Sequence, residues 1–288
     1  MSVPAGDDIH YPAKPVVHRQ AEYEEENYAQ LLQMQRRHFW YLGRHRFLLH
    51  AVVDELRHRE RGLRAIDLGG GCGGWLEYLH ARVPDLFGEL ALADSSLEAL
   101  TAAQAIVHGF ATRYQVDLYD LGWEERWDVA FLLDVLEHLH HDDDVLRQIG
   151  SALRPGGLLF VTAPALPLFH SWNDELVHHL RRYTRADVAR LARQAGLVLR
   201  RSRYFMFFLS PLLLARRAWP FERTLSPEDA RRLLARTHAV PLPAINQVLR
   251  SIFSLETPLG WHLPFPWGTS VLAVFEKPPA ARRPSSSR

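Results

Sequence analysis

The feature that most constrains the fold of this chain is a glycine-rich loop directly after a short apolar segment. Residues 65–75 read Ala-Ile-Asp-Leu-Gly-Gly-Gly-Cys-Gly-Gly-Trp, so one acid, Asp67, precedes five glycines. Glycine permits φ > 0 and lets backbone N–H groups approach a ligand, as in nucleotide-binding turns at the carboxyl edge of parallel sheets. The segment therefore predicts a strand, a tight turn and a helix, with a nucleotide-type cofactor at the turn.

Short apolar strands alternate with helices beyond residue 60, and such alternation is typical of a mostly parallel sheet with helices on both faces. We expect strands at 63–68, 89–93, 112–116, 128–133, 157–162, 197–204 and 270–276. We expect helices at 74–82, 96–106, 142–153 and 185–195. The pattern therefore predicts an α/β fold of the Rossmann-like type.

The segments outside this pattern divide the chain into parts. About 60 residues separate the last two expected strands, which is too many for a loop in a compact α/β domain. We expect a helical N-terminal cap at 1–60, whose first 20 residues form a loose lead-in, a cofactor-binding core at 61–204, a helical substrate-side lobe at 205–268, the last core strand at 269–277 and a disordered tail at 278–288.

Composition narrows the class of protein. The formal net charge is +1, which does not favour nucleic-acid binding. The single cysteine, Cys72, leaves no intramolecular disulfide, and Met1–Gln20 lacks the apolar core of a signal peptide. We therefore expect a cytoplasmic protein that acts on a small molecule. The sequence does not determine its oligomeric state.

The glycine spacing by itself fits two cofactors. Gly69, Gly71 and Gly74 satisfy G-x-G-x-x-G, and Asp94 follows 20 residues later, as in NAD-binding proteins. However, Asp67 would face the pyrophosphate that such a loop binds. S-adenosylmethionine has no phosphate, and its ammonium and sulfonium suit a carboxylate. Charge therefore favours S-adenosylmethionine, although an acid here can also simply accept bonds from loop amides.

Further acids follow the next expected strands. Asp94 is expected to accept the ribose hydroxyls, or else to cap the helix that begins near Ser96. Asp117, with the Leu118 N–H beside it, is expected at the adenine amino group, or else in a turn. Asp134 ends the fourth strand and should face the methionine end of the cofactor. The predicted cofactor-binding residues are Asp67, Gly69, Gly70, Gly71, Gly73, Asp94, Ser95, Asp117, Leu118, Asp134 and Val135.

In this order the motifs resemble those of class I S-adenosylmethionine-dependent methyltransferases (EC 2.1.1.-). The resemblance covers about 35–277 and rests on Ile-Asp-Leu-Gly-Gly-Gly-Cys-Gly, Ala-Asp-Ser-Ser, Val-Asp-Leu, Asp-Val-Leu-Glu-His-Leu and Leu-Arg-Pro-Gly-Gly. The chain is most similar to bacterial type-11-like enzymes, through His38-Phe-Trp-Tyr-Leu-Gly-Arg44 and Ser171-Trp-Asn-Asp-Glu-Leu-Val-His-His-Leu-Arg-Arg-Tyr-Thr184. Asn173 stands where those enzymes usually have histidine. The resemblance implies seven strands, with 270–276 antiparallel and inserted beside the fifth.

Polar side chains after the fourth and fifth strands are candidates for the acceptor side. A hydroxyl acceptor needs a base, and histidine can accept a proton near neutral pH. The predicted catalytic residues are His179, His138 and Asp174. An alternative is that Asp174, His179, Arg182 and Tyr183 form a network that only fixes this segment. The predicted acceptor-binding residues are Trp40, His170, Trp172, Tyr183 and Phe205, although aromatic residues at such spacing also suit a core.

Two further patterns have competing interpretations. The acids of Asp142–Asp144 suit the start of a helix better than a metal site, and we predict no metal. The apolar segment Tyr204–Ala215, followed by two arginines, suits a buried cap helix. Alternatively, it contacts a membrane surface and admits a lipid-like acceptor.

The leading hypothesis is methyl transfer from S-adenosylmethionine to a small-molecule hydroxyl, with S-adenosylhomocysteine as the product. Natural products and quinone-like, lipid-like or glycan-related compounds are candidate acceptors, in bacterial secondary or envelope metabolism. Methylation of an amine or peptide is an alternative, and an NAD-dependent oxidoreductase is a further one. A non-methylating protein on the same fold also stays open.

Overall fold

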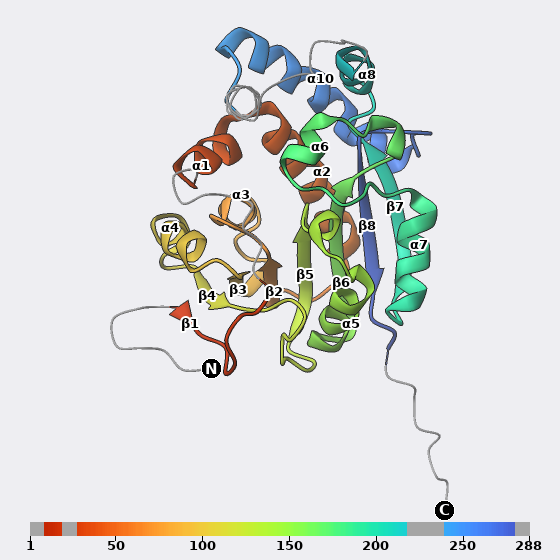
Figure 1. Cartoon of the computed structure of the whole chain (residues 1–288). Helices are drawn as coiled ribbons and strands as arrows, with labels where there is room; N and C mark the ends of the chain where they lie inside the picture. The colour runs from red at the N-terminus through yellow and green to blue at the C-terminus, as the bar shows by residue number, and fades with distance from the viewer. Residues whose placement is uncertain (1–8, 19–27, 218–238, 280–288) are drawn as a thin grey trace, which may run out of the picture.

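The protein has a central sheet with helices on both faces (Figure 1). The computed structural model describes residues 9–18, 28–217 and 239–279. In that part the sheet has eight strands in the order β1-β4-β3-β2-β5-β6-β8-β7. The strands are β1 (Ile9–His10), β2 (Leu63–Leu68), β3 (Phe87–Asp94), β4 (Ala111–Gln115), β5 (Trp127–Leu133), β6 (Leu153–Pro164), β7 (Val198–Phe205) and β8 (Ser270–Glu276). The expected α/β Rossmann-like class is confirmed.

The last strand takes the position that the family resemblance implied. Strands β1 to β6 pair in parallel, whereas β8 runs antiparallel between β6 and β7. Ser270 at the start of β8 pairs with Pro164 at the end of β6. The segment between β7 and β8 therefore begins and ends at the edge where the parallel strands end.

Two expectations are wrong because of one strand: the sheet has eight strands and not seven, and part of the expected loose lead-in at 1–20 belongs to the sheet. Ile9 and His10 pair in parallel with Arg113 and Tyr114 of β4 and add an eighth strand at the sheet edge. Ile9 is 1% exposed, so its side chain extends the core. A two-residue strand is too short to show periodicity, which explains why the sequence pattern missed it.

Helices cover the two faces of the sheet. The cap predicted at 1–60 contains α1 (Tyr28–Arg37) and α2 (Phe39–Leu56), separated at His38, whose side chain accepts a bond from the Trp40 N–H at 3.2 Å. The other helices among the described residues are α3 (Gly74–His80), α4 (Leu97–Val107), η2 (Leu136–His138), α5 (Asp142–Ala152), η3 (Pro167–Phe169), α6 (Trp172–Leu176), α7 (Arg185–Gln194), α8 (Ser210–Arg217) and α10 (Pro243–His262).

Alternate side chains of each central strand enter different halves of the core. On β2, Ile66 and Leu68 pack with residues of α5 and α7, whereas Ala65 packs with residues of α2, α3 and α10. Strands buried on both faces are expected in a parallel sheet covered by helices. This burial explains why the strands read as continuous apolar runs.

Helix α10 packs directly on α2, so the lobe and the cap contact each other (Figure 1). A Cβ atom at Gly43 would lie 2.0 Å from the ring of Phe253, so only glycine permits this approach. Phe47 of α2 stacks on Phe205 at the end of β7, with ring centroids 5.0 Å apart. Both helices are thereby held beside the carboxyl edge of the sheet.

Among the described residues, no helix is both long and apolar enough to cross a bilayer. Residues 280–288 of the predicted tail, and 218–238 of the predicted lobe, lie outside the described residues.

Candidate active site

The glycine loop joins β2 to α3 with the expected backbone geometry. Gly69, Gly71 and Gly73 have φ of 70°, 55° and 80°, a region that residues with a Cβ rarely adopt. Several loop amides are already bonded within the protein. The Gly69 N–H donates to Ala93 O at 2.8 Å, and the Gly71 N–H donates to Asp94 at 2.9 Å. These two N–H groups therefore shape the loop and are not directed at a ligand.

Asp67 is a buried carboxylate directly below this loop. It is 1% exposed, and neither carboxylate oxygen has a hydrogen-bond partner within the protein. Burial raises the pKa of Asp67 to about 7. The charge of nearby Arg44 works to lower this pKa, and the charge of Asp94 works to raise it. A Cβ at Gly70 would lie 2.4 Å from Asp67 Oδ2, so glycine leaves room for this carboxylate. A buried acid without donors suits a cationic ligand group.

Arg44 is a site residue that the sequence analysis did not identify. It lies on α2, is 5% exposed, and forms an ion pair with Asp134 at the end of β5. Its guanidinium packs over the rings of Trp40 and Tyr41, 5.0 and 5.1 Å from their centroids. The cap therefore places a buried positive charge between two strand-end acids. In the sequence, the feature that could have identified Arg44 is its position at the end of the His38–Arg44 motif.

Asp94 ends β3 as expected, and both of its carboxylate oxygens accept backbone bonds. Oδ2 accepts from Gly71 and Oδ1 from Ser96, each at 2.9 Å. Ser96, rather than Asp94, caps α4 by accepting from the Ala99 N–H. Ser95 lies beside it, half-buried. Each carboxylate oxygen can accept a second bond, so a role at ribose hydroxyls remains our prediction.

Asp117 faces the N-terminal segment in this structure. Its Oδ2 accepts from the N–H groups of Val17 and His18, each at 3.1 Å, and from the His18 ring at 3.0 Å. Burial works to raise the pKa of Asp117, but these donors and the Tyr119 N–H hold it below its ordinary value. The predicted adenine position, with half-buried Leu118, therefore lies beside the strand-forming segment at 9–18.

The end of β5 brings the loop and the acceptor side together. Asp134 has a φ of 55°, uncommon for a residue other than glycine and typical of functional sites. Its N–H donates to Thr162 O on β6 at 2.9 Å. The side chain of Val135 packs against Gly69, where an added Cβ would approach it to 2.6 Å. The predicted positions around the loop are therefore close in space.

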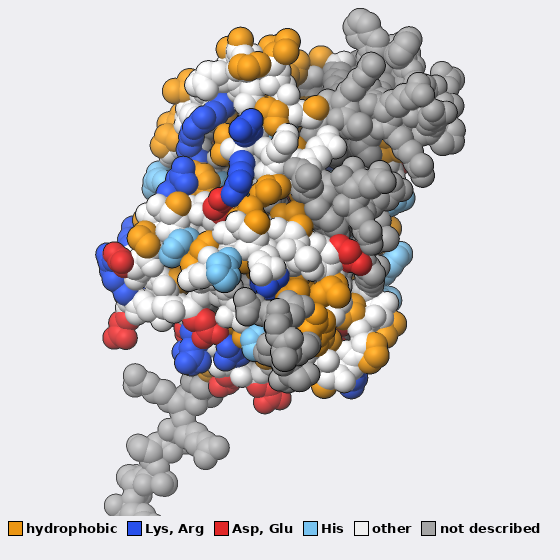
Figure 2. All heavy atoms as spheres, turned by 90° about the vertical axis from the view of Figure 1, so that its left-hand side faces the viewer, with side chains coloured by type: hydrophobic (Ala, Val, Ile, Leu, Met, Phe, Trp, Pro, Cys, Tyr) orange, Lys and Arg blue, Asp and Glu red, His pale blue; other side chains and the backbone are white. Residues whose placement is uncertain are grey.

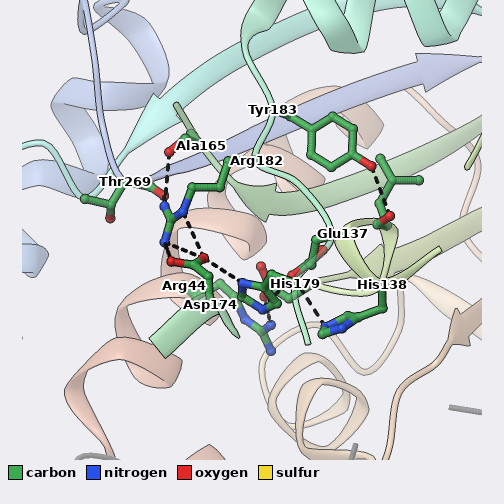
Figure 3. Close-up of polar contacts among 11 residues, drawn as sticks. Arg44, Glu137, His138, Ala165, Asp174, His179, Arg182, Tyr183 and Thr269 are labelled. Carbon is green, nitrogen blue, oxygen red and sulfur yellow. Dashed lines mark hydrogen bonds and ion pairs between the residues drawn. The ribbon is translucent and has the colours of Figure 1, made fainter. Parts of the chain in front are cut away.

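Three of the predicted polar residues after β6 form a connected network (Figure 3). His179 Nδ1 lies 2.8 Å from Asp174 Oδ1, and Arg182 donates two bonds to the same carboxylate at 2.9 and 3.1 Å. Asp174 is fully buried. Burial works to raise the pKa of its carboxyl, but the bond from His179 and the charge of Arg182 lower this pKa to about 2. An ionised Asp174 only accepts, so His179 Nδ1 donates in this hydrogen bond.

His138 lies across from His179, with Glu137 between them (Figure 3). The two rings are 4.8 Å apart at 69°, and Glu137 Oε1 is 3.8 Å from His179 Nε2 and 4.0 Å from His138 Nε2. The donor atoms of these three residues lie within 4.8 Å of one another and could surround a metal ion. The absence of a metal stays a prediction.

The predicted acceptor residues lie in two environments. Trp40 and Trp172 are half-buried, and His170 is exposed beside α6. Tyr183 and Phe205 are each 1% exposed. Tyr183 donates to Asp142 at 2.8 Å and to Leu136 O at 3.0 Å, and Phe205 stacks in the core. The first three are therefore accessible to a bound molecule, whereas the last two are enclosed in the protein.

A family model described as "Methyltransferase domain" matches residues 32–202, more than half of the chain. With the fold and the strand-end acids, this match places the chain among the class I S-adenosylmethionine-dependent methyltransferases, and the chain belongs to this family. The match excludes our oxidoreductase alternative as the class of this domain.

Among curated proteins, the chain is similar to ubiquinone biosynthesis O-methyltransferases. It is 34% identical over 106 residues to that of Mesorhizobium japonicum, covering 35% of this chain and 40% of the relative. It is 27% identical over 172 residues to that of Bordetella avium, covering 52% and 70%. The chain thus spans less than half the length of the first relative.

Solved methyltransferase structures share the fold at low sequence identity. A Haloferax volcanii methyltransferase in complex with its Trm112 activator has a TM-score of 0.58 at 16% identity, covering 91% of this chain and 99% of that one. A Haemonchus contortus phosphoethanolamine N-methyltransferase, in complex with S-adenosylhomocysteine, has a TM-score of 0.57 at 17% identity, covering 90% and 59%. These likenesses establish the fold.

Proposed function

We propose that this protein transfers a methyl group from S-adenosylmethionine to a hydroxyl group of a small molecule. The observation that supports the proposal is the hydrogen bond between His179 Nδ1 and buried Asp174, which would leave Nε2 as the atom that accepts the proton of the hydroxyl. The similarity to ubiquinone O-methyltransferases supports a hydroxyl acceptor, of quinone-like or related chemistry.

The residues around the glycine loop fit this cofactor. When bound, S-adenosylmethionine supplies a methyl group on a positively charged sulfur and departs as S-adenosylhomocysteine. Asp67, buried and without a donor, would hold the α-ammonium group. Arg44 would hold the carboxylate, since the N–H groups of Gly69 and Gly71 are bonded within the loop. Asp94 would accept the ribose hydroxyls.

On the acceptor side, His179 would remove the proton of the hydroxyl as the new oxygen–carbon bond forms. The proton moves to Nε2, and the bond from Nδ1 to Asp174 stabilises the resulting positive charge. Arg182 holds Asp174 ionised, so the imidazole keeps the tautomer that this step requires. Trp40 and Trp172 would exclude water and orient the acceptor, because such displacements depend mainly on alignment.

The test is turnover of His179→Ala with radiolabelled S-adenosylmethionine and a panel of phenols, quinols and amines. Loss of a general base should lower O-methylation by roughly a hundred-fold or more. Affinity for S-adenosylhomocysteine should change less than about two-fold, because His179 lies outside the predicted cofactor residues. The control is His178→Ala, whose exposed side chain precedes it. Unchanged O-methylation by His179→Ala, or methylation of amines alone, would contradict the proposal.

A further inference from the structure

Residues 9–18, which we call the N-terminal strap, run along the edge of the sheet from β4 to the predicted adenine position. Ile9 and His10 pair in parallel with β4, and the ring of His10 stacks on that of Tyr114, with ring centroids 4.7 Å apart. Because β1 is parallel to β4, the residues that follow it continue toward the carboxyl edge of the sheet, where Asp117 lies (Figure 1).

The far end of the strap contacts Asp117 through both backbone and side chain. Asp117 Oδ2 accepts bonds from the N–H groups of Val17 and His18, each at 3.1 Å. The ring nitrogen Nδ1 of His18 lies 3.0 Å from Oδ2 and 3.2 Å from Oδ1. The same ring packs against that of Tyr119, with centroids 4.4 Å apart. The strap therefore covers the carboxylate that we assign to the adenine amino group.

These contacts use the accepting capacity of Asp117. Burial works to raise its pKa, but the N–H donors of His18 and Tyr119 hold it below its ordinary value, so the carboxylate is ionised and only accepts. A carboxylate has about four acceptor sites. The N–H groups of Val17, His18 and Tyr119, together with the His18 ring, fill them. An adenine amino group therefore needs the strap to leave before it can bind Asp117.

The far end of the strap is held by exposed groups. Lys14 forms an ion pair with Asp120 at 2.6 Å, and the side chains of Lys14 and His18 are 79% and 57% exposed. Figure 2 faces the side on which β1 lies in Figure 1, and shows acidic, basic and histidine side chains next to one another on its lower half. Exposed ion pairs contribute little to stability, so this end can detach while β1 stays in the sheet.

We propose that residues 14–18 form an autoinhibitory contact, which occupies the adenine position before the cofactor binds and detaches when it does. The adenine amino group then replaces the strap donors on Asp117, and β1 keeps the strap tethered at the edge of the sheet. Because the closed form cannot bind, the contact lowers the apparent affinity for the cofactor. This inference rests on the proposed function, since it requires S-adenosylmethionine to bind with its adenine at Asp117.

The first test is hydrogen exchange of the wild-type full chain with and without saturating S-adenosylhomocysteine. Without the ligand, the amides of Val17 and His18 should be protected by their bonds to Asp117. The ligand should speed their exchange by about ten-fold or more, because it favours the open form. Unchanged exchange would overturn the proposal. Slower exchange would also overturn it, and would make the strap a wall of the cofactor site.

The second test is calorimetry on a strap variant. Lys14→Glu/His18→Ala removes the ion pair and the ring contact, and should bind S-adenosylhomocysteine about three-fold to ten-fold more tightly than the wild type. The matched controls are Arg61→Glu, which breaks an exposed ion pair with Asp85, and His58→Ala at an exposed position. Both controls should bind as the wild type does. Equal affinities of the strap variant and the controls would overturn the proposal.

The two tests separate this inference from the proposed function. If the wild type binds S-adenosylhomocysteine and exchange at Val17 and His18 does not rise, the strap proposal is wrong while the cofactor assignment stands. If the wild type does not bind S-adenosylhomocysteine, the proposed function fails and the strap proposal fails with it. Melting temperatures establish that each variant is folded, and the exchange test requires no variant.

Discussion

The two halves of the candidate site are built in different ways. The cofactor half consists of neighbouring strand ends, where Asp67, Asp94 and the glycine loop lie within a short stretch of chain and are joined by backbone bonds. The acceptor half consists of a network of side chains after β6, in which Asp174 accepts bonds from His179 and Arg182. A loop with positive φ requires glycine and therefore leaves a signature in local sequence, whereas a side-chain network has no such requirement and does not reveal which acceptor it faces. The cofactor could therefore be predicted from the sequence, whereas the acceptor could not.

The largest effect is expected for Gly70→Ala, which tests whether the backbone of the glycine loop shapes the cofactor half of the site. The new Cβ would lie 2.4 Å from the Asp67 carboxylate and 2.5 Å from Leu92, so the loop must shift. We expect affinity for S-adenosylhomocysteine to fall by about a hundred-fold, on the scale of two or more lost contacts. Calorimetry measures it, and Gly150→Ala, where the nearest atom is 3.3 Å away, is the control. Equal affinities would show that the loop does not shape the cofactor site.

A smaller effect is expected for Asp94→Ala, which removes a side chain and leaves the loop glycines unchanged. Loss of two bonds to the ribose should weaken S-adenosylhomocysteine binding by roughly ten-fold or more. Asp143→Ala, at a half-buried position in the first turn of α5, serves as a control. If Asp94→Ala binds as the wild type does, Asp94 only orders Gly71 and Ser96.

The pH dependence of S-adenosylhomocysteine binding tests the proposal that Asp67 holds the α-ammonium group. Burial raises its pKa to about 7, so the free carboxyl is largely neutral below that pH. A cationic ligand binds the ionised form, and affinity should therefore rise about ten-fold between pH 6 and pH 8. The same shift makes folding of the free protein less favourable as pH rises from about 4 to about 7, because the unfolded chain ionises first. Asp67→Asn should bind with a flat pH profile. A flat profile for the wild type would place the ammonium elsewhere.

The smallest effect is expected for metal removal. We predict that His179 acts as a base and not as a metal ligand, so EDTA should change turnover less than about two-fold. The assay is methyl transfer before and after dialysis against the chelator. A loss that zinc or magnesium restores would make Glu137, His138 and His179 metal ligands, and would end the assignment of His179 as a base.

Much of the fold was predictable because local sequence carries it. The expected strand at 63–68 coincides with β2, and that at 270–276 with β8, since short, mostly apolar segments mark strands buried on both faces. The short strand β1 was missed, because two residues cannot show a period. The contact between Asp117 and His18 was also missed, since it joins segments 99 residues apart.

The sequence by itself determined the cofactor class, because glycines and acids at strand ends act through the backbone of one continuous segment. It also determined which residue types were available as a base. Only the tertiary structure decided that Asp174 orients His179, that α2 inserts Arg44 beside Asp67 and Asp134, and that the N-terminal strap reaches Asp117. These features depend on how distant segments pack, and packing is a property of the folded chain as a whole.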